Sequence, residues 1–490
     1  MIRKEFPRVT PESVGIPSGA IEKLLDTLEF GGFTEPHGLM IYRHGKVCAE
    51  GWWSPYTAGM RHALMSHTKT YAGTAVGIAV TEGLVKLSDR LIDIFPDKAP
   101  EEPSEYLKKL TVQDVLCMGV GMPRMPRQEL DWVRAFLGNE IVYEPGTRFI
   151  YSTSCELLAA IVREVSGYGL MDYLKPRLFD KIGIDAKNLS WARMGDGCEF
   201  VSAGLQATTE DNLRLMALYL NQGVWEGERI LSEEYVKLAT TTRIITINPD
   251  DKRPVPENFN PGYGYMIWMC PPQESYRADG MGGQYTVVLP PLDMIISITE
   301  SSVTPFQALE AFWKLLEEVS DEALPEDEEA SRKLRERMQR LSLPAEPVAP
   351  FARRRYTIDG VQWHMASGSV SFGSTRFDFG FNKGLTDFSF RFSGDHLHFT
   401  FTEDGVTQSV RADLDGSRHW NEISSGTVWC SAYWLDDDTL RLVWRPTAGM
   451  FTRKIDFAFR GTGCSITDEG GLNIRLPGTP EPEPIFAIRK

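Results

Sequence analysis

The chain has 490 residues, of which 42% are hydrophobic and 24% are charged. That length exceeds what one hydrophobic core ordinarily organises, so we expect two or three domains. The 52 lysines and arginines against 67 aspartates and glutamates give a net charge of −15, which argues against nucleic acid or an anionic membrane as the main partner.

The cysteines and the apolar runs indicate the compartment. Seven cysteines are scattered along the chain without a Cys-x-x-Cys pair or a disulfide framework, which favours reduced thiols and no metal site. The stretch Met1–Pro7 has no apolar run of the signal-peptide kind, and no stretch reaches the roughly 18 apolar residues that a membrane span needs. We therefore expect a cytoplasmic protein without a membrane partner or a cofactor.

Helical and strand patterns mix through residues 1–320. A helical period predicts a helix over Pro17–Phe30, and two short apolar runs around His44-Gly45 predict a hairpin over Gly38–Gly51. Further helices are expected at 66–82, 111–118, 156–165, 171–182, 208–220 and 306–319. Gly83 is expected to end the helix over 66–82, and Thr209 to be the N-cap of the helix over 208–220. Strands are expected at 263–268, 285–289 and 294–299. Strands near both ends of a helical middle indicate an α/β domain whose sheet is made from both ends.

The pattern of apolar and charged residues changes after residue 320. Residues 321–350 comprise a charged surface helix, with Leu334, Met338 and Leu341 on one face, and a proline-rich linker. From 351 to 490, aromatic and aliphatic residues alternate with polar ones between turns, for example at Phe377, Phe379 and Phe381, and at Leu397, Phe399 and Phe401. This alternation predicts an antiparallel all-β domain, a barrel or a sandwich with aromatic filling.

One stretch could carry chemistry. Ser66 and Lys69 are three residues apart at the start of the predicted helix of small residues, so both side chains lie on one helix face. A serine there lies near the positive end of the helix dipole. Burial of Lys69 would lower its pKa and make it a proton acceptor for the serine hydroxyl. The Ser-x-x-Lys pattern alone is weak, since chance copies are common.

Two further motifs follow it in order. Tyr151 lies 85 residues after Ser66, in Pro145-Gly146-Thr147-Arg148-Phe149-Ile150-Tyr151-Ser152-Thr153, just before an apolar helix. Ala278-Asp279-Gly280-Met281-Gly282-Gly283 leads into a strand.

With Ser-x-x-Lys, these motifs resemble the serine β-lactamase and penicillin-binding-protein superfamily, in particular its class C-like branch of esterases, D-aminopeptidases and amide hydrolases. The resemblance covers roughly Pro11–Val319. It implies an antiparallel sheet flanked by helices with a helical subdomain, while the β domain resembles accessory domains of some members.

The resemblance also implies roles. Ser66 would be the acylated nucleophile, Lys69 would help to deprotonate it, and Tyr151 would be a phenolate-like base and the acid for the leaving group. Backbone N–H groups of Ser66 and Met281 would form the oxyanion hole. Thr153, Asp279 and Gly280 would contact an ester or amide substrate, small or peptide-like, and a homo-oligomer stays open.

Two positions depart from the family pattern. Thr153 stands where asparagine is usual, and Ala278-Asp279-Gly280 replaces an opening lysine or histidine before Thr-Gly. The second change removes the cation that would pair with the carboxylate of a β-lactam, so we expect weak β-lactamase activity at most. Asp279 either faces the site, favouring an amine-bearing or neutral substrate, or is a turn carboxylate bonded to local N–H groups.

Several other residues have simpler explanations. His67 is expected to pack rather than act as a base, and His396 and His398 to share a solvated strand face rather than bind zinc. Trp268 either lines a substrate cleft or belongs to the core. Three functions remain open: a serine hydrolase, an acyltransferase on the same scaffold, and a catalytically inactive binding or sensor protein.

Overall fold

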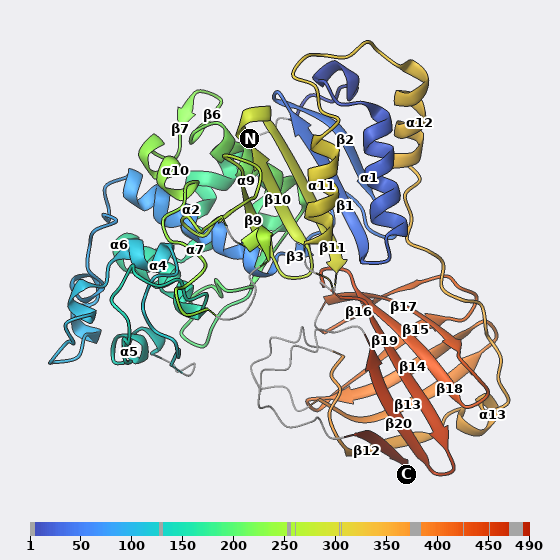
Figure 1. Ribbon diagram of the computed structural model, residues 1–490. Coiled ribbons are helices and arrows are strands. Elements are labelled where there is room, and N and C mark those ends of the chain that lie inside the picture. The colour runs from blue at the N-terminus through green and yellow to red at the C-terminus, as the bar shows by residue number, and fades with distance from the viewer. Residues whose placement is uncertain are drawn as a thin grey trace. The chain divides into compact units, whose positions relative to one another are not determined.

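A computed structural model describes residues 5–126, 131–251, 256–259, 261–302, 304, 306–372, 384–424, 426–449, 451–469 and 484–490. The chain divides into an N-terminal unit, Met1–Ser342, and a C-terminal unit, Leu343–Lys490 (Figure 1). The predicted strand residues Phe377, Phe379 and Phe381 lie outside the described residues. No helix in the described ranges is long and apolar enough to cross a membrane.

The N-terminal unit is built on a six-stranded antiparallel sheet in the order β2-β1-β11-β10-β9-β8. Its strands are β1 (Thr34–Arg43), β2 (Lys46–Trp52), β8 (Trp268–Met269), β9 (Tyr276–Gly280), β10 (Gln284–Leu289) and β11 (Met294–Ser302). The predicted hairpin is confirmed: β1 and β2 are joined at His44-Gly45, where both φ angles are positive, as a two-residue hairpin turn requires. The centre of the sheet thus pairs β1, from the start of the unit, with β11, from its end.

Helices cover both faces of this sheet. α1 (Ser18–Phe30) and α11 (Gln307–Leu316) pack together over one face, and α9 (Thr209–Leu220) crosses behind β10 and β11 (Figure 1). Strand β10 is buried along its whole length, as a strand covered on both faces must be.

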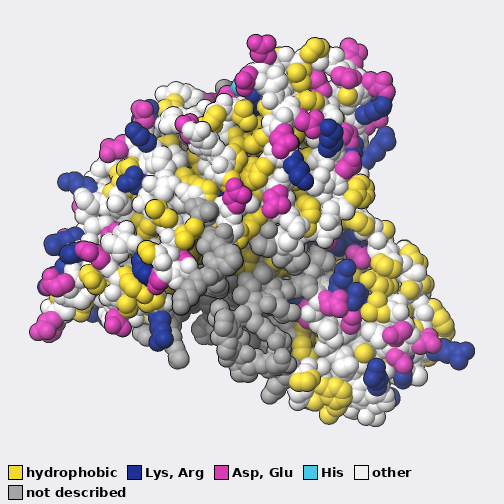
Figure 2. Space-filling view, viewed as in Figure 1, with side chains coloured by type: hydrophobic (Ala, Val, Ile, Leu, Met, Phe, Trp, Pro, Cys, Tyr) yellow, Lys and Arg dark blue, Asp and Glu magenta, His cyan; other side chains and the backbone are white. Residues whose placement is uncertain are grey.

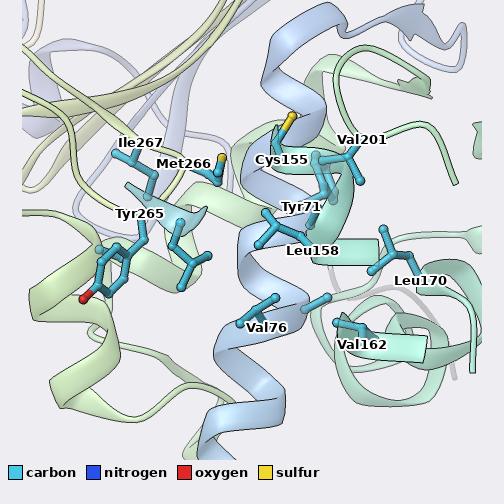
Figure 3. Packing of buried hydrophobic residues seen from close by; sticks show 14 of the residues in the cluster. Tyr71, Val76, Cys155, Leu158, Val162, Leu170, Val201, Tyr265, Met266 and Ile267 are labelled. Carbon is cyan, nitrogen blue, oxygen red and sulfur yellow. The ribbon is translucent and has the colours of Figure 1, made fainter. Parts of the chain in front are cut away.

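The helical part of the unit surrounds α2 (Thr68–Thr81), which is buried on all sides from Thr68 to Ala79. Figure 3 shows Leu158 and Val162 of α6 (Leu157–Ser166) on one side of it, and Tyr265–Ile267 on the other. Small residues make this packing possible: a Cβ at Gly77 would collide with the ring of Tyr235. The sequence of small residues therefore produces a helix enclosed by protein, with its N-terminus beside the sheet.

The remaining elements are short. The helices are α3 (Leu91–Ile94), α4 (Val112–Leu116), α5 (Trp132–Leu137), α7 (Leu170–Leu174), α8 (Asp180–Ile182) and α10 (Glu233–Ala239), and the small strands are β3 (His62–Ala63), β4 (Ser190–Trp191), β5 (Leu205–Ala207), β6 (Val224–Trp225) and β7 (Glu228–Arg229). The predicted helix over 171–182 is divided into α7, a π-helical turn at Lys175–Phe179, and α8.

Two local predictions are wrong. The N-cap of α9 is Thr208 rather than Thr209, because the Thr208 side chain accepts the Asp211 N–H while the Asp211 carboxylate accepts the Thr208 N–H. The expected strand over 263–268 is mostly irregular, since Met266 has a left-handed backbone, and only Trp268–Met269 pair in the sheet.

The charged segment after the sheet forms α12 (Glu328–Met338). Its apolar face is buried as predicted, at Leu334, Met338 and the following Leu341. On its other side Arg337 pairs with three carboxylates of α1, those of Glu22, Asp26 and Glu29. The helix therefore belongs to the N-terminal unit.

The C-terminal unit is an antiparallel β-barrel. Its strands are β12 (Gln362–Ser367), β13 (Leu385–Ser393), β14 (His396–Glu403), β15 (Val406–Asp413), β16 (His419–Ile423), β17 (Gly426–Trp434), β18 (Thr439–Pro446), β19 (Arg453–Arg460), β20 (Gly463–Glu469) and β21 (Ile485–Arg489), preceded by α13 (Arg355–Ile358). The ring is closed by one parallel pairing, between Asp413 of β15 and Ser431 of β17. Asn421 supports that closure because its amide exchanges two hydrogen bonds with the backbone of Arg411.

Aromatic side chains fill the barrel, as the alternation predicts. Five rings are almost fully buried and contact one another in edge-to-face, tilted or stacked pairs: Phe388, Phe390, Phe399, Phe401 and Phe457. His398 is on the outward face of β14, and the described residues contain no group of three or more His, Cys, Asp or Glu that could hold a metal ion. On the face shown in Figure 2, acidic and basic side chains are interspersed and no continuous basic patch is seen.

Candidate active site

Ser66 lies in a 3-10 turn, η2 (Met65–His67), directly before α2. Met65 has a left-handed backbone (φ 51°), which is unusual for a residue with a side chain. Residues 62–65 and 67–72 are buried while Ser66 is half-buried, so its hydroxyl is the group that this turn leaves accessible. The turn thus presents Ser66 at the N-terminal end of a buried helix.

Lys69 is 3% exposed and its ammonium group faces Ser66. Nζ donates a hydrogen bond of 2.9 Å to Ser66 Oγ and one of 2.7 Å to the carbonyl oxygen of Ser202. Burial by itself lowers the pKa of Lys69, but its interactions with Tyr151, Cys155 and Glu156 outweigh burial, and the pKa is raised above the usual value. The expected lowering of this pKa is therefore wrong, and Lys69 is charged at neutral pH.

Tyr151 is next to both groups, two residues before the short helix η5 (Thr153–Glu156). Lys69 Nζ lies 5.0 Å from the centroid of its ring, and the ring packs beside Trp268 at 5.5 Å between centroids. Tyr151 is 39% exposed, yet the protein atoms around the phenol raise its pKa, while Lys69 and the Ser66 hydroxyl act to lower it. The phenol therefore keeps its proton at rest, and its role as a base stays a prediction.

The end of β9 closes the third side of the site. Gly280 must be glycine, because a Cβ there would overlap the carbonyl oxygen of Leu64, two residues before Ser66. The following turn is held by Gln284, whose amide nitrogen donates to the carbonyl oxygens of Gly282 (3.1 Å) and Glu300 (2.6 Å). Met281 is the first residue of this turn, so its backbone is close to η2 in the fold; its oxyanion role stays a prediction.

Asp279 is on strand β9 and not in a turn, which overturns the explanation as a turn carboxylate. Arg277, two residues earlier on the same strand face, donates from Nε to Asp279 Oδ2 at 2.8 Å. The Arg277 side chain is fully buried and that of Asp279 is 13% exposed. The two charges neutralise each other beside the site, and the Asp279 charge acts to raise the pKa of Tyr151.

Other predicted residues have smaller parts. Thr153 is half-buried at the start of η5, and among the described residues its side chain makes no hydrogen bond to Ser66, Lys69 or Tyr151. His67 is fully buried, and burial lowers its pKa to about 3, so the imidazole packs in neutral form and is no base. Trp268 is 8% exposed and lies in an aromatic cluster with Phe149, Phe259 and Tyr263, which makes it part of the core beside Tyr151.

Three residues around the site escaped the sequence-based prediction. Ser202 acts through its backbone carbonyl, which leaves no mark on the side-chain pattern. The carboxylate of Glu156 accepts the N–H groups of Val201 and Ser202, but in the sequence Glu156 is only the first residue of the helix predicted over 156–165. Arg277 could have been found from the alternation of strand residues, which places it on the same face as Asp279.

Comparison with known proteins identifies the family of the N-terminal unit. The family model described as Beta-lactamase matches residues 37–318. The 6-aminohexanoate-dimer hydrolase of Paenarthrobacter ureafaciens is 26% identical over 284 residues, which are 52% of this chain and 70% of that protein.

Solved structures share the fold. A proposed 6-aminohexanoate-dimer hydrolase from Bacillus anthracis superposes with a TM-score of 0.51 at 19% identity, covering 64% of this chain and 86% of that one. A proposed beta-lactamase from Bacteroides dorei gives a TM-score of 0.51 at 14% identity, covering 62% of this chain and 99% of that one. These likenesses concern the fold of the chain and not its substrate.

Proposed function

The chain belongs to the beta-lactamase family, a family of hydrolases, and from that premise we propose that it is a serine hydrolase that forms an acyl-enzyme on Ser66. The observation that carries this proposal is the cluster at the half-buried Ser66 hydroxyl, where Lys69 Nζ donates a 2.9 Å hydrogen bond to Oγ and lies 5.0 Å from the centroid of the Tyr151 ring. A lone serine hydroxyl is a weak nucleophile, and an adjacent group that takes its proton makes it reactive.

Acylation would proceed through the Lys69 and Tyr151 pair. In the reactive form the pair has lost one proton, and the phenolate oxygen of Tyr151 accepts the Ser66 proton while Lys69 keeps its positive charge beside Oγ. Ser66 Oγ bonds to the acyl carbon, the carbonyl electrons move to the oxygen, and the tetrahedral intermediate collapses as Tyr151 returns the proton to the leaving alcohol or amine. Water repeats the sequence and releases the acid.

Two backbone N–H groups, of Ser66 and Met281, are proposed to stabilise the oxyanion. One such donor is worth about 3–4 kcal/mol in other acyl-transfer enzymes. Gly280 supports this assignment, since it lets the end of β9 approach the turn that carries Ser66.

The charge balance beside the site suggests a substrate class. Among the described residues near Ser66, Lys69 is engaged by Ser66 and Ser202, and Arg277 is paired with Asp279. Neither a cation for a substrate carboxylate nor an anion for a substrate amine is then available from these groups. We therefore propose neutral esters or amides as substrates, and weak β-lactamase activity at most.

The test is intact-mass spectrometry during turnover of neutral p-nitrophenyl esters and p-nitroanilides. The proposal expects a burst of nitrophenol or nitroaniline and a mass increase equal to one acyl group in the wild-type chain. Ser66→Ala should show neither, while Ser13→Ala, a half-buried serine elsewhere in the unit, should behave as the wild type. Turnover that persists in Ser66→Ala would refute the proposal.

A further inference from the structure

The buried carboxylate of Glu156 is connected to the proposed catalytic Lys69 through the backbone of one intervening residue, Ser202. Glu156 is the last residue of η5 and is 3% exposed. Its Oε2 accepts the N–H of Val201 at 2.7 Å and its Oε1 accepts the N–H of Ser202 at 2.9 Å. Both oxygens are therefore committed to two successive backbone groups of one segment.

That segment lies outside the helices and strands, and besides Glu156 it is held by the Gly204 N–H, which donates to Phe200 O at 2.9 Å, and by a 3.3 Å contact between Ser202 Oγ and Cys155 Sγ. Residues 201–203 form a turn between Phe200 and β5, so no helix or strand ladder fixes their peptide groups. The carbonyl oxygen of Ser202 nevertheless accepts a 2.7 Å hydrogen bond from Lys69 Nζ. The position of this carbonyl, and through it the direction of the Lys69 ammonium group, depends on what holds the turn.

We propose that Glu156 is a positioning residue: its carboxylate clamps the turn at Val201 and Ser202 so that the Ser202 carbonyl holds Lys69 against Ser66. The inference rests on the proposed function of Ser66 and Lys69. It links the Glu156 carboxylate to the backbone N–H of Ser202, and the backbone carbonyl of the same residue to Lys69 Nζ and then Ser66 Oγ, through three hydrogen bonds of 2.9 Å or less.

A carboxylate suits this position better than an amide. An ionised carboxylate has acceptors on both oxygens, whereas a glutamine would turn an NH₂ donor toward one of the two N–H groups. A buried N–H without a partner is destabilising, and the turn can avoid that by shifting away from the glutamine. A shift of about 1 Å at a catalytic group can reduce the rate about 100-fold.

The charge of Glu156 has a second effect on Lys69. The titratable groups that face the ammonium are Tyr151, Cys155 and Glu156, with Asp279 acting on Tyr151. Burial raises the pKa of the Cys155 thiol to about 12 and keeps it neutral. Burial also raises the pKa of Glu156, while the Val201 and Ser202 bonds and Lys69 oppose that rise, so Glu156 helps to hold the proton on Lys69.

The experiment compares Glu156→Gln, Glu156→Asp and the control Glu164→Gln, an exposed glutamate on α6. The rate of labelling by an alkyl fluorophosphonate and the kcat and KM for a neutral p-nitrophenyl ester are measured across pH. Glu156→Gln should lower kcat about 10- to 100-fold with KM nearly unchanged. Removal of the anion should also move the acidic limb of the labelling profile to lower pH. A purely structural glutamate would change neither the limb nor the split between kcat and KM.

The two other variants complete the test. Glu156→Asp keeps the charge, so it should leave the acidic limb in place while kcat falls. This variant also tests the positioning role if Glu156→Gln does not fold. Glu164→Gln should match the wild type in all readings. If the wild type is labelled but Glu156→Gln keeps the acidic limb in place and has an unchanged kcat, this inference alone is overturned. A wild type that is not labelled at all overturns the proposed function, and this inference with it.

Discussion

Lys69 and Tyr151 show how burial and charge compete at single residues. Burial alone favours a neutral lysine, and a lysine next to Tyr151 favours a phenolate. In the structure the interactions with acidic neighbours prevail over burial at Lys69, and burial prevails over Lys69 at Tyr151, so the pKa of each group is raised and both keep their protons at neutral pH. One proton must leave this coupled pair before Ser66 can be activated, and the apparent pKa belongs to the pair.

The protonation states of Lys69 and Tyr151 predict the pH dependence of hydrolysis. Because the reactive form is the one that has lost a proton and both pKa values are raised, kcat/KM for a neutral ester should rise between about pH 6 and about pH 9. Tyr151→Phe should lower kcat/KM about 100-fold or more, and Tyr168→Phe, an exposed tyrosine, should leave it unchanged. A wild-type profile that falls over this range would contradict the assignment.

The Arg277–Asp279 pair makes a separate prediction at the same scale. Asp279→Asn leaves the fully buried Arg277 cation without its partner, which should lower the free energy of unfolding by about 3 kcal/mol. The freed charge should raise kcat/KM for carboxylate-bearing esters relative to neutral ones, with Asp172→Asn as the exposed control. An unchanged ratio in a folded Asp279→Asn would remove the argument for neutral substrates.

How far the sequence predicts these residues depends on whether a residue acts through its own side chain or through its backbone and distant neighbours. Ser66 and Lys69 can be picked out because their side chains are three residues apart on one helix face, and Tyr151 because its motif resembles that of a family; their catalytic roles stay proposals. Ser202 acts through a backbone carbonyl, and the protonation of Lys69 depends on neighbours brought from 82 and more residues away, such as Tyr151. Neither can be derived from a local pattern.

At the scale of elements, the close approach of β9 to η2 brings the turn that begins at Met281 close to Ser66. Gly280→Ala should push these two elements apart, because the added Cβ would overlap Leu64 O and lie 2.8 Å from Gln284 Cβ. We expect a loss of stability of about 1–3 kcal/mol and a fall in kcat/KM of about 100-fold, measured by urea unfolding and ester hydrolysis.

Gly59→Ala is the matched control for that change, since a Cβ at Gly59 meets nothing within 4 Å. It should leave both measurements unchanged. If Gly280→Ala loses stability but keeps full activity, the oxyanion role proposed for Met281 would be contradicted.

Most elements were predictable from periodicity, and the failures have physical causes. The hairpin of β1 and β2 and the helices α1 and α6 follow the apolar spacing closely. Residues 263–268 have the apolar composition of a strand, but the left-handed backbone of Met266 turns the chain so that it packs against α2. The Met266 side chain lies so close to Gly73 of α2 that a Cβ added there would be 3.1 Å from it. Tertiary packing overrides local propensity there.

At the scale of the whole molecule, each unit has a hydrophobic core of its own. The core of the barrel is aromatic, and Phe399 at its centre is fully buried. Phe399→Ala should destabilise the barrel by about 3–5 kcal/mol and lower its thermal transition. The labelling rate of Ser66 by fluorophosphonate should stay unchanged below that transition, because the proposed machinery lies within residues 64–284.

Phe486→Ala provides the surface control in the same unit, since Phe486 is 38% exposed. It should lower the transition much less than Phe399→Ala. A parallel loss of barrel stability and Ser66 labelling in Phe399→Ala would mean that the barrel takes part in building the site.

The central claim is that Ser66 is the nucleophile, and mapping the modified residue tests it most directly. The wild-type chain is treated with an alkyl fluorophosphonate near its pH optimum, digested, and sequenced by mass spectrometry. The account predicts one label per chain, on Ser66, and none in Ser66→Ala. A stoichiometric label on any other residue, or an unlabelled wild type that still hydrolyses esters, would contradict it.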